Sequence, residues 1–435
     1  MQSEMRPLGE FVTLVSGNTP SKANPAYWGS GTPWVSAKDM GDFWIEDAED
    51  HLTDAGVAVA SRLMPPGSVL LLARGMTLHK RVPICRVARA STFNQDVKAV
   101  LPKAGLSSRF LPYLLVGNHD RLHERVDSAG HGTGRLNTNE LLSFPVVVPS
   151  FSEQEGIADI GEAIDERLRL LRQTNATLES IAQALFKSWF IDFDPVRAKA
   201  EGREPEGMDA STAALFPAEF EESALGLIPK GWGACSVANL CARVTNGATP
   251  SRSNPSFWQD GTIPWFKTGE LFDSHLLDAT ERISRQAVEK TNVKVLPRHA
   301  VLMAIYAAPT VGRLGILTSE AAFNQACTGM VALPEVGPWY LFQSLFHGRE
   351  WFNSRANGAA QQNISKAIVE SYQCVRPCAN VLRAFNETAG TLYASAEKNA
   401  LQAQVLVKLR DTLLPRLISG KLRLPEAETA IEAVA

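Results

Sequence analysis

Two long stretches of the chain place apolar residues at intervals that alternate between three and four, the spacing of a coiled-coil helix. The first is expected to begin at a capping box, Ser152 to Glu155, and to end at Phe190, which is about 39 residues or ~58 Å of helix. The second is expected over residues 379–420. We expect the two helices to pair antiparallel and to form a rigid spacer. The apolar positions are Ile157, Ile160, Ile164, Leu168, Leu171, Leu178, Ala182, Leu185 and Trp189 in the first stretch, and Leu382, Phe385, Ala389, Leu392, Ala396, Ala403, Leu406, Leu413 and Leu417 in the second.

An asparagine interrupts each of these apolar rows near its centre, Asn175 in the first and Asn399 in the second. One interpretation is that both are polar residues tolerated at the seam. The other is that they hydrogen-bond across the helix pair and fix its register, as a buried seam asparagine can. The sequence leaves the two interpretations open.

Short runs of β-branched and aliphatic residues, separated by turn residues, precede each long helix and predict strands. Two further segments, residues 110–118 and 338–346, predict short helices. The fold class expected is therefore α/β or α+β, with two similar domains separated by the antiparallel coiled coil. The predicted strands are residues 68–72, 82–87, 97–101 and 144–148 in the first half, and 300–305, 314–318 and 329–333 in the second.

The two halves of the chain resemble each other. Residues 17–28 read GNTPSKANPAYW and residues 247–258 read GATPSRSNPSFW, an offset of 230 with seven identical positions. Phe-Asn-Gln at 93–95 recurs at 323–325 with the same offset. Such a register across rare residue types indicates a duplicated domain of about 150 residues. Structural roles are expected for the shared residues: Trp28, Trp34, Trp258 and Trp265 in the core, Thr19-Pro20-Ser21 and Asn24-Pro25 in turns, and Gln95 and Gln325 in a shared fold role rather than in base readout.

The chain has 435 residues, which is too long for one ordinary core. The connector between the copies is rich in Glu, Pro, Gly and Ala. Together with the repeat, these observations predict six segments. They are a first domain (1–150), a central helix (151–198), the connector (199–232), a second domain (233–378), a second long helix (379–420) and a tail (421–435).

Composition narrows the possible functions. No apolar run approaches the roughly 20 residues that span a bilayer, and the N-terminus does not resemble a secretory signal. The six cysteines are expected to be reduced thiols of a cytoplasmic protein. The closest pairs, Cys235 with Cys241 and Cys374 with Cys378, have no nearby histidine in zinc-finger spacing, so no metal is expected.

The formal net charge is −3, which argues against a protein that holds DNA by general basicity. Either DNA is not the partner, or basic residues gather on one face while other subunits supply part of the contacts with the DNA phosphates. Composition alone does not choose between these alternatives.

Four local patterns, in order and at proper spacing, resemble the specificity subunits of type I restriction–modification systems. The first is the opening G-x-T-P-S-x-x-N-P-x-[YF]-W, which is used twice. The others are residues 227–232 (LIPKGW), residues 185–190 with 192–195 (LFKSWF, DFDP), and residues 413–422 (LLPRLISGKL). The resemblance covers nearly the whole chain.

The resemblance implies a DNA-recognition subunit without catalytic activity of its own. Each domain would be a target-recognition domain that reads one half of a bipartite, asymmetric double-stranded DNA target, with a nonspecific gap set by the helices. Two adenine-methylating modification subunits would dock on the helices and share the phosphate contacts, with restriction subunits outside them. S-adenosylmethionine, ATP and Mg would then be bound by partner subunits only. The partner-binding residues implied are Trp189, Phe190, Leu417 and Ile418.

Candidate DNA contacts lie in loops. Arg74, Lys80 and Arg81 flank a loop after a predicted strand, where Arg can bond a guanine edge and Lys more often neutralises phosphate. A solvated basic loop is the alternative. Glutamines at 361–362 suit adenine edges, or cap turns. The full set is Arg74, Lys80, Arg81, His131 and Arg135 in the first copy, and Lys267, Arg313, Gln361 and Gln362 in the second.

Two other functions remain to be weighed. Asn24-Pro25-Ala26-Tyr27 and its second copy resemble the N-P-P-[YF] motif of amino-methyltransferases, but the third position differs and no Gly-rich cofactor loop follows a strand. The stretch 130–135 (GHGTGR) precedes no strand–helix unit that would make it a phosphate-binding loop. A pure assembly scaffold, without DNA contact, is the second alternative.

Overall fold

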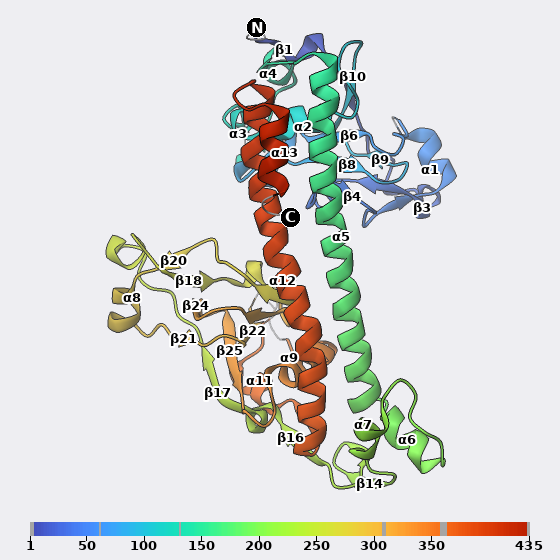
Figure 1. Ribbon diagram of the computed structural model, residues 1–435, viewed down its shortest axis with the longest axis vertical. Coiled ribbons are helices and arrows are strands. Elements are labelled where there is room, and N and C mark those ends of the chain that lie inside the picture. Colours follow the sequence, from blue (N-terminus) through green and yellow to red (C-terminus); the bar gives the residue numbers. More distant parts are fainter. Residues whose placement is uncertain (1–3, 61, 130–131, 307–309, 357–362, 433–435) are drawn as a thin grey trace. The chain divides into compact units, whose positions relative to one another are not determined.

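The computed structural model describes residues 4–60, 62–129, 132–306, 310–356 and 363–432. The chain divides into two units (Figure 1). Unit 1 comprises Met1–Arg169 with Gln404–Ala435, and unit 2 comprises Leu170–Ala403. The boundary falls inside both long helices, α5 (Phe151–Phe190) and α12 (Ala379–Ile418), which have 40 residues each.

A five-stranded sheet forms the centre of unit 1. The run Val69–Leu72 is buried on both faces, which suits its uninterrupted apolar sequence. All neighbours are antiparallel except the last pair. The strand order is β2 (Val12–Ser16), β10 (Val97–Pro102), β6 (Val69–Leu72), β8 (Ile84–Val87) and β4 (Trp44–Ile45).

Smaller sheets and short helices surround this sheet. One three-stranded sheet is β5 (His51–Leu52), β3 (Trp28–Val35) and β9 (Thr92–Phe93), another is β11 (Asp127–Ala129), β12 (Thr133–Arg135) and β7 (Arg74–Gly75), and β1 (Arg6–Pro7) pairs with β13 (Pro145–Val146). The helices of unit 1 besides α5 and α12 are α1 (Asp54–Val59), α2 (Leu111–Val116), α3 (His119–His123), α4 (Thr138–Ser143) and α13 (Leu424–Glu432).

Unit 2 repeats the five-stranded sheet with the same strand order and the same parallel last pair. This correspondence supports the duplication that the sequence predicts. The strands are β17 (Cys241–Asn246), β25 (Cys327–Ala332), β22 (Val301–Ala304), β23 (Leu314–Leu317) and β19 (Ser274–Leu276). Unit 2 also has β16 (Gly233–Ser236) with β26 (Gln373–Arg376), the sheet β20 (Arg282–Ile283), β18 (Ile263–Phe266), β24 (Ala321–Phe323) and β21 (Val295–Leu296), and the helices α8 (Arg285–Lys290), α9 (Pro338–His347), α10 (Arg349–Asn353) and α11 (Lys366–Ser371).

Most residues shared by the two copies have structural roles, although Trp28 and Trp258, predicted to be in the core, are only partly buried. Thr19 donates to Gln95 at 2.6 Å, and Thr249 makes the same bond to Gln325. Trp34 is buried, and its indole N–H donates to the backbone oxygen of Asn18 at 3.1 Å. In the second copy the indole N–H of Trp265 likewise donates to the backbone oxygen of Ala248. Asn24 and Asn254 each accept a backbone N–H and cap the turn that follows.

Helix α5 begins at a capping box, but two residues before the one predicted. Ser150 donates its backbone N–H to Glu153 at 2.9 Å, and the Ser150 hydroxyl accepts from the Glu153 amide at 3.4 Å. The predicted box of Ser152 and Glu155 is therefore wrong. Glu155 instead accepts from Arg109 at 2.8 Å, which joins the first turn of α5 to the loop before α2.

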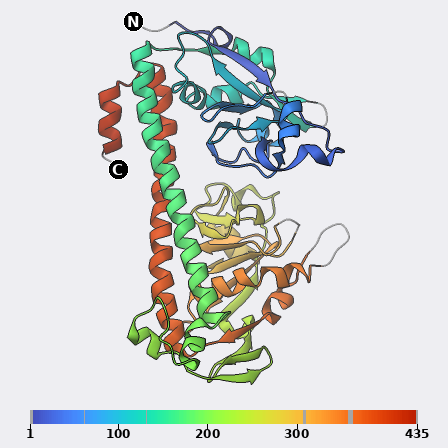
Figure 2. The same cartoon turned by 90° about the vertical axis from the view of Figure 1, so that its right-hand side faces the viewer.

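The two long helices pack together and run antiparallel, as predicted (Figures 1 and 2). In unit 2 the Asn399 amide donates to the Asn175 side chain at 2.9 Å, and the Asn175 amide donates to the backbone oxygen of Ala396 at 2.9 Å. The interpretation in which these asparagines bond across the helix pair is therefore confirmed. Later residues of α5 meet earlier residues of α12, because Trp189 contacts Phe385.

In unit 1 the helix pair encloses an ion pair. Arg410 of α12 donates to Asp165 of α5 at 2.9 Å, and the two side chains are 12% and 3% exposed. Burial raises the pKa of the Asp165 carboxyl, while the nearby Arg410 acts in the opposite direction. A charge this deeply buried is tolerated only when it is paired.

The predicted connector is an ordered part of unit 2. It contains helix α7 (Ala210–Ala214) and a hairpin of β14 (Phe220–Ser223) with β15 (Gly226–Pro229). The segment predicted as the central helix, 151–198, is not one helix: α5 ends at Phe190, and a separate helix, α6 (Asp194–Ala200), follows. Phe216, Ile228 and Trp232 are buried in the same core as the end of α5. Across the described ranges, no helix is both long enough and apolar enough to cross a membrane.

Candidate nucleic-acid interface

The small sheet β7–β12–β11 carries a row of exposed charged residues in unit 1. Arg74 of β7 lies directly opposite Arg135 of β12, and Arg135 lies opposite Asp127 of β11. Residues directly opposite in antiparallel strands project from the same face. Two of the predicted DNA contacts, Arg74 and Arg135, are thus neighbours although 61 residues separate them.

The segment after β7 packs beneath this row. Met76 begins a short 3-10 helix, Met76–His79, and is 67% exposed. His79 Nε2 lies 2.6 Å from the backbone oxygen of Gly132. A side chain at Gly134 would come within 2.8 Å of Leu78 Cβ, so a glycine is needed for β12 to pack closely here. Lys80, the next predicted contact, is exposed at the end of this helix.

Arg81 has a different environment from Arg74 and Lys80. Its guanidinium donates to the backbone oxygens of Met40 and Gly41, both at 2.8 Å. These bonds hold the segment before β4 against the start of β8. The predicted contact of Arg81 with DNA remains untested, and its bonds assign it a structural role.

In unit 2 the predicted contacts Lys267 and Arg313 lie in unlike surroundings. Lys267 pairs with Glu281 at 2.7 Å. Hydrogen bonds, first from Arg252 and then from Lys267, lower the pKa of Glu281 to about 2, so Glu281 stays ionised and balances one of the two positive charges beside it. Arg313 instead lies over the ring of Phe272, 5.7 Å from its centre. Phe272 is 65% exposed, so this cation and aromatic ring face solvent together.

The structure adds a pair that the sequence did not single out, Asp273 and Arg349. Arg349 donates to Asp273 at 2.9 Å and to the backbone oxygen of Gly312 at 3.1 Å. Asp273 also accepts the backbone N–H of Leu314 at 2.8 Å. The pair therefore fixes the segments that carry Phe272 and Arg313. Its only signal in the sequence is an aspartate at the matching position of the first copy, Asp42.

Three predicted contacts, His131, Gln361 and Gln362, lie outside the described residues. The four residues implied as partner contacts are instead core residues. Trp189 and Phe190 are each 4% exposed and pack in an aromatic cluster with Phe385. Leu417 and Ile418 are 5% and 4% exposed. Such burial is at odds with direct contact to another subunit by these side chains, because each already fills the interior of its own unit.

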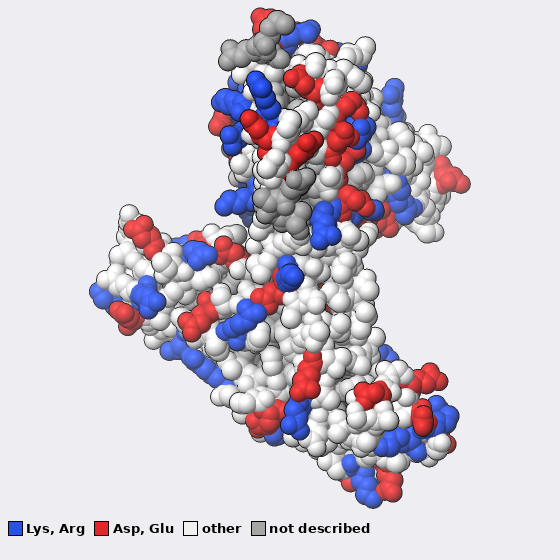
Figure 3. Space-filling model, in the orientation of Figure 1, with Lys and Arg blue, Asp and Glu red and all other residues white. Residues whose placement is uncertain are grey.

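One stretch of each long helix in unit 2 has almost no charged residues. Residues 173–186 contain one charged residue, Glu179, and residues 388–396 contain none. Figure 3 shows this stretch of helix as a mostly uncharged surface. Ile181, in the first of these stretches, is 48% exposed. An exposed surface without charge is typical of protein interfaces.

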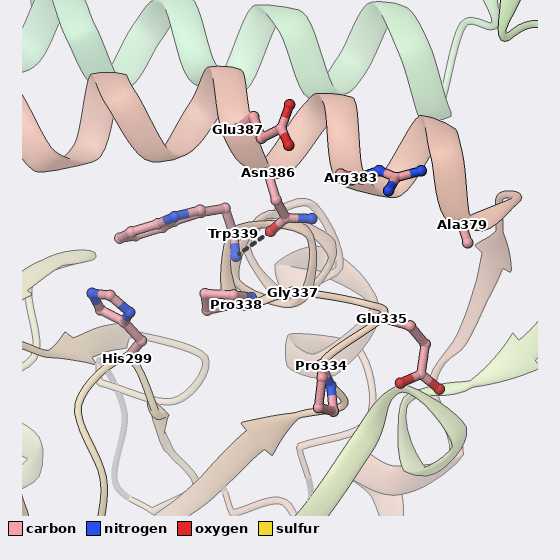
Figure 4. A pocket seen from close by; sticks show the side chains of 10 residues that line it. All are labelled: His299, Pro334, Glu335, Gly337, Pro338, Trp339, Ala379, Arg383, Asn386 and Glu387. Atoms are coloured by element: carbon pink, nitrogen blue, oxygen red, sulfur yellow. Dashed lines mark hydrogen bonds between the residues drawn. The ribbon is translucent and has the colours of Figure 1, made fainter.

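A hollow of about 540 Å³ lies beside α12 in unit 2 (Figure 4). Asn386 spans it: its side-chain oxygen accepts from the Trp339 amide at 3.1 Å, and its amide donates to the backbone oxygen of Val336 at 2.8 Å. The hollow therefore holds a helix packing contact, with its central polar group already bonded. Among the residues whose positions are described, no group of three or more His, Cys, Asp and Glu is arranged to hold a metal.

The repeated Asn-Pro motif is also used structurally. The side-chain oxygen of Asn24 accepts from the backbone N–H of Ala26 at 3.1 Å, and Asn254 accepts from Ser256 at 3.2 Å. In an amino-methyltransferase the corresponding asparagine would have to face a substrate amine. Here the asparagine oxygen caps a turn in both copies.

Comparison with protein families identifies the origin of this duplicated architecture. The model of the type I restriction modification DNA specificity domain matches residues 2–180 and 229–377, which together include both repeats. The chain belongs to this family. The resemblance inferred from the four sequence patterns is confirmed.

Curated members of the specificity family span most of this chain. It is 24% identical to the type I restriction enzyme MjaIX specificity subunit of Methanocaldococcus jannaschii, over 97% of this chain and 94% of that protein. It is 26% identical to the HindI specificity subunit of Haemophilus influenzae, over 72% and 77%. A solved S subunit from M. genitalium covers 95% of both chains with a TM-score of 0.52 at 11% identity, a likeness of fold alone.

Proposed function

We propose that this chain is the DNA-recognition subunit of a type I restriction–modification complex. Each unit reads one half of a bipartite, asymmetric target in double-stranded DNA. The observation that carries the proposal is that one fold occurs twice with different exposed side chains. Arg74 and Arg135 are exposed in unit 1, whereas unit 2 exposes Phe272 beside Arg313. Two readers with a shared fold and different surfaces suit two different half-sites.

The net charge of −3 fits a reader that shares its DNA with other subunits. Base contacts give specificity, while phosphate contacts give most of the affinity and its salt dependence. Among the candidate DNA contacts that the structure describes, the exposed arginines are Arg74 and Arg135, and modification subunits would supply the remaining phosphate contacts. Methyl transfer, with S-adenosylmethionine, and translocation, with ATP and Mg, belong to the partner subunits in this proposal.

We place the docking site for the modification subunits on the nearly uncharged stretches of α5 and α12, residues 173–186 and 388–396, because the seam residues are buried. The change Ile181→Glu introduces a charge on this face at a position that is 48% exposed. It should leave the thermal unfolding of the chain unchanged and weaken its co-elution with a modification subunit in size-exclusion chromatography. Ala163→Glu, an exposed position among the charged residues of α5, is the matched control and should co-elute normally.

The recognition function is tested by salt titration of the assembled complex. Fluorescence anisotropy would compare a duplex containing the methylated motif of the host genome with a scrambled duplex. The logarithm of the binding constant should fall linearly with the logarithm of the salt concentration, and the target should bind more tightly at every salt concentration. Equal, salt-independent signals for both duplexes would favour the scaffold alternative.

A further inference from the structure

The backbone hydrogen bonds show which residues of the two units occupy equivalent positions. In unit 1 the N–H of Leu136 donates to the oxygen of Ala73 at 2.8 Å. In unit 2 the N–H of Ile364 donates to the oxygen of Ile305 at 2.9 Å.

The next residues along each strand then face each other. These are Arg74 opposite Arg135 in unit 1 and Tyr306 opposite Asn363 in unit 2. One cross-strand pair is thus built into both copies, with different chemistry in each.

The arginine pair of unit 1 is electrostatically unfavourable as it stands. Like charges directly opposite each other on antiparallel strands destabilise the sheet. Asp127 lies on the other side of Arg135, but none of the ion pairs among described residues joins it to either arginine. The two guanidinium groups remain exposed. A ligand that presents acceptor atoms to both would relieve the repulsion.

The row of Asp127, Arg135 and Arg74 matches the major-groove edge of a G·C base pair. Guanine presents two acceptors, O6 and N7, to which a guanidinium can bond bidentately. Cytosine presents the N4 amino group, from which a carboxylate can accept a hydrogen bond. The row offers both chemistries on one exposed face.

The equivalent pair in unit 2 has donors and acceptors without a charge. Tyr306 is 39% exposed and carries a hydroxyl, while Asn363 is half-buried and carries an amide. An asparagine amide can bond both N6 and N7 of adenine. The chemistry of this pair favours an A·T base pair over a G·C pair.

We propose that this cross-strand pair is a specificity-determining position in each unit. Arg74 and Arg135 read a G·C pair in one half-site, and Tyr306 and Asn363 read an A·T pair in the other. The inference rests on the proposed function and adds which base pair each unit recognises at this position. The competing role for the arginines is phosphate binding, which would carry no sequence information.

The test exchanges the pairs in the assembled complex. Binding is measured to a panel of duplexes, each with one base pair of the target changed. The wild-type complex should discriminate by roughly 5- to 150-fold at a G·C position in one half-site. Arg74→Tyr with Arg135→Asn should abolish that discrimination and leave the other half-site unaffected. Tyr306→Arg with Asn363→Arg should change an A·T position in the other half-site alone.

Two single variants keep the test decisive if an exchanged pair fails to fold. Arg74→Lys retains the charge but not the bidentate geometry, so it should lose base discrimination and keep the salt dependence. Arg6→Gln removes an exposed arginine that pairs with Glu10, and it should bind every duplex as the wild type does.

Three results would overturn the inference while the wild-type complex still selects its target. The first is an equal loss of affinity for all duplexes together with a shallower salt dependence. The second is a change of base discrimination in both half-sites, and the third is no change of discrimination at all. A wild-type complex that selects no target would instead refute the proposed function itself.

Discussion

Gly161 shows how a single residue position fixes the packing of α5 on unit 1. A Cβ atom there would lie 2.5 Å from the ring of Tyr113, which is fully buried. In an exposed helix Gly→Ala is stabilising by about 1 kcal/mol. Here we expect Gly161→Ala to reduce the free energy of unfolding by about 1–3 kcal/mol, because the rigid ring has no room to move. Urea titration followed by tryptophan fluorescence would measure the change.

Ala163→Gly is the control for this prediction. Ala163 is exposed on the same helix, two residues away, so it reports helix propensity without a clash. It should cost about 1 kcal/mol. Stabilisation by Gly161→Ala would show that the ring of Tyr113 leaves room for a side chain at this position.

His275 should make the stability of unit 2 depend on pH. Burial lowers its pKa to about 4, with smaller and opposing effects from Glu397 and from His299 with Arg298. The folded pKa lies below the unfolded value near 6.5, so the unfolded chain binds the proton first as the pH falls. Stability is therefore complete above about pH 6.5 and is lost progressively toward pH 4, by at most about 3 kcal/mol.

Thermal unfolding of the wild type and of His275→Phe at pH 7 and pH 5 would test this. The first copy has Trp44 at the equivalent strand position, so a larger aromatic ring is compatible with this fold. The variant should lose less stability between the two pH values than the wild type. Equal losses would show that other groups cause the acid sensitivity.

At the residue scale, the sequence predicted positions that are tied to the repeat. Structural roles for Thr19, Gln95 and the Asn-Pro turns could be inferred because both copies keep them, but the bond between Thr19 and Gln95 could not. Asp273 with Arg349 could not be inferred, because the two are joined only by tertiary structure. The partner contacts at Trp189 and Phe190 stay untested, and their burial could not be predicted, since a motif at a helix end does not show which side faces the core.

At the scale of elements, the two asparagines that bond across the long helices should be energetically coupled. A double-mutant cycle with Asn175→Ala, Asn399→Ala and the double variant isolates their interaction. We expect a coupling energy of about 0.5–1.5 kcal/mol, the net value of a neutral hydrogen bond. Additive single effects in urea titrations would show that the 2.9 Å bond between these side chains contributes nothing to stability.

The ion pair of Asp165 and Arg410 should behave differently from the asparagines. Arg410→Met leaves a carboxylate that is 3% exposed without its partner and should cost about 3–5 kcal/mol. Asp165→Leu combined with Arg410→Met removes both charges and should recover most of that loss. Chemical unfolding of the three proteins distinguishes these outcomes. A double variant as unstable as the single one would mean that the pair itself, rather than the unpaired charge, determines stability.

The elements themselves were largely readable from the sequence. The predicted strand 97–101 is β10, and the predicted helix 338–346 is α9. Strand 82–87 was predicted two residues too early, because β8 begins at Ile84. The capping box was misplaced because both Ser150 and Ser152 are followed three residues later by glutamate, and only the backbone shows where the helix begins.

At the scale of the whole molecule, the central claim is that one polypeptide contains two DNA readers of common origin and different specificity. The repeat made the duplication visible in the sequence, and the shared strand order of the two central sheets agrees with it. The target bases are not readable from the sequence in the same way, because recognition also depends on loop geometry and DNA shape.

Single-molecule sequencing of adenine methylation in host cells, with and without this gene, tests the claim most directly. We expect one bipartite motif, two specified halves around an unspecified gap, to be methylated in cells that carry the gene and unmethylated in cells that lack it. Restoring the gene with Arg74→Ala should alter one half of the motif and leave the other half intact. A methylation pattern that does not change when the gene is deleted, from cells in which the modification subunits are present, would contradict the account.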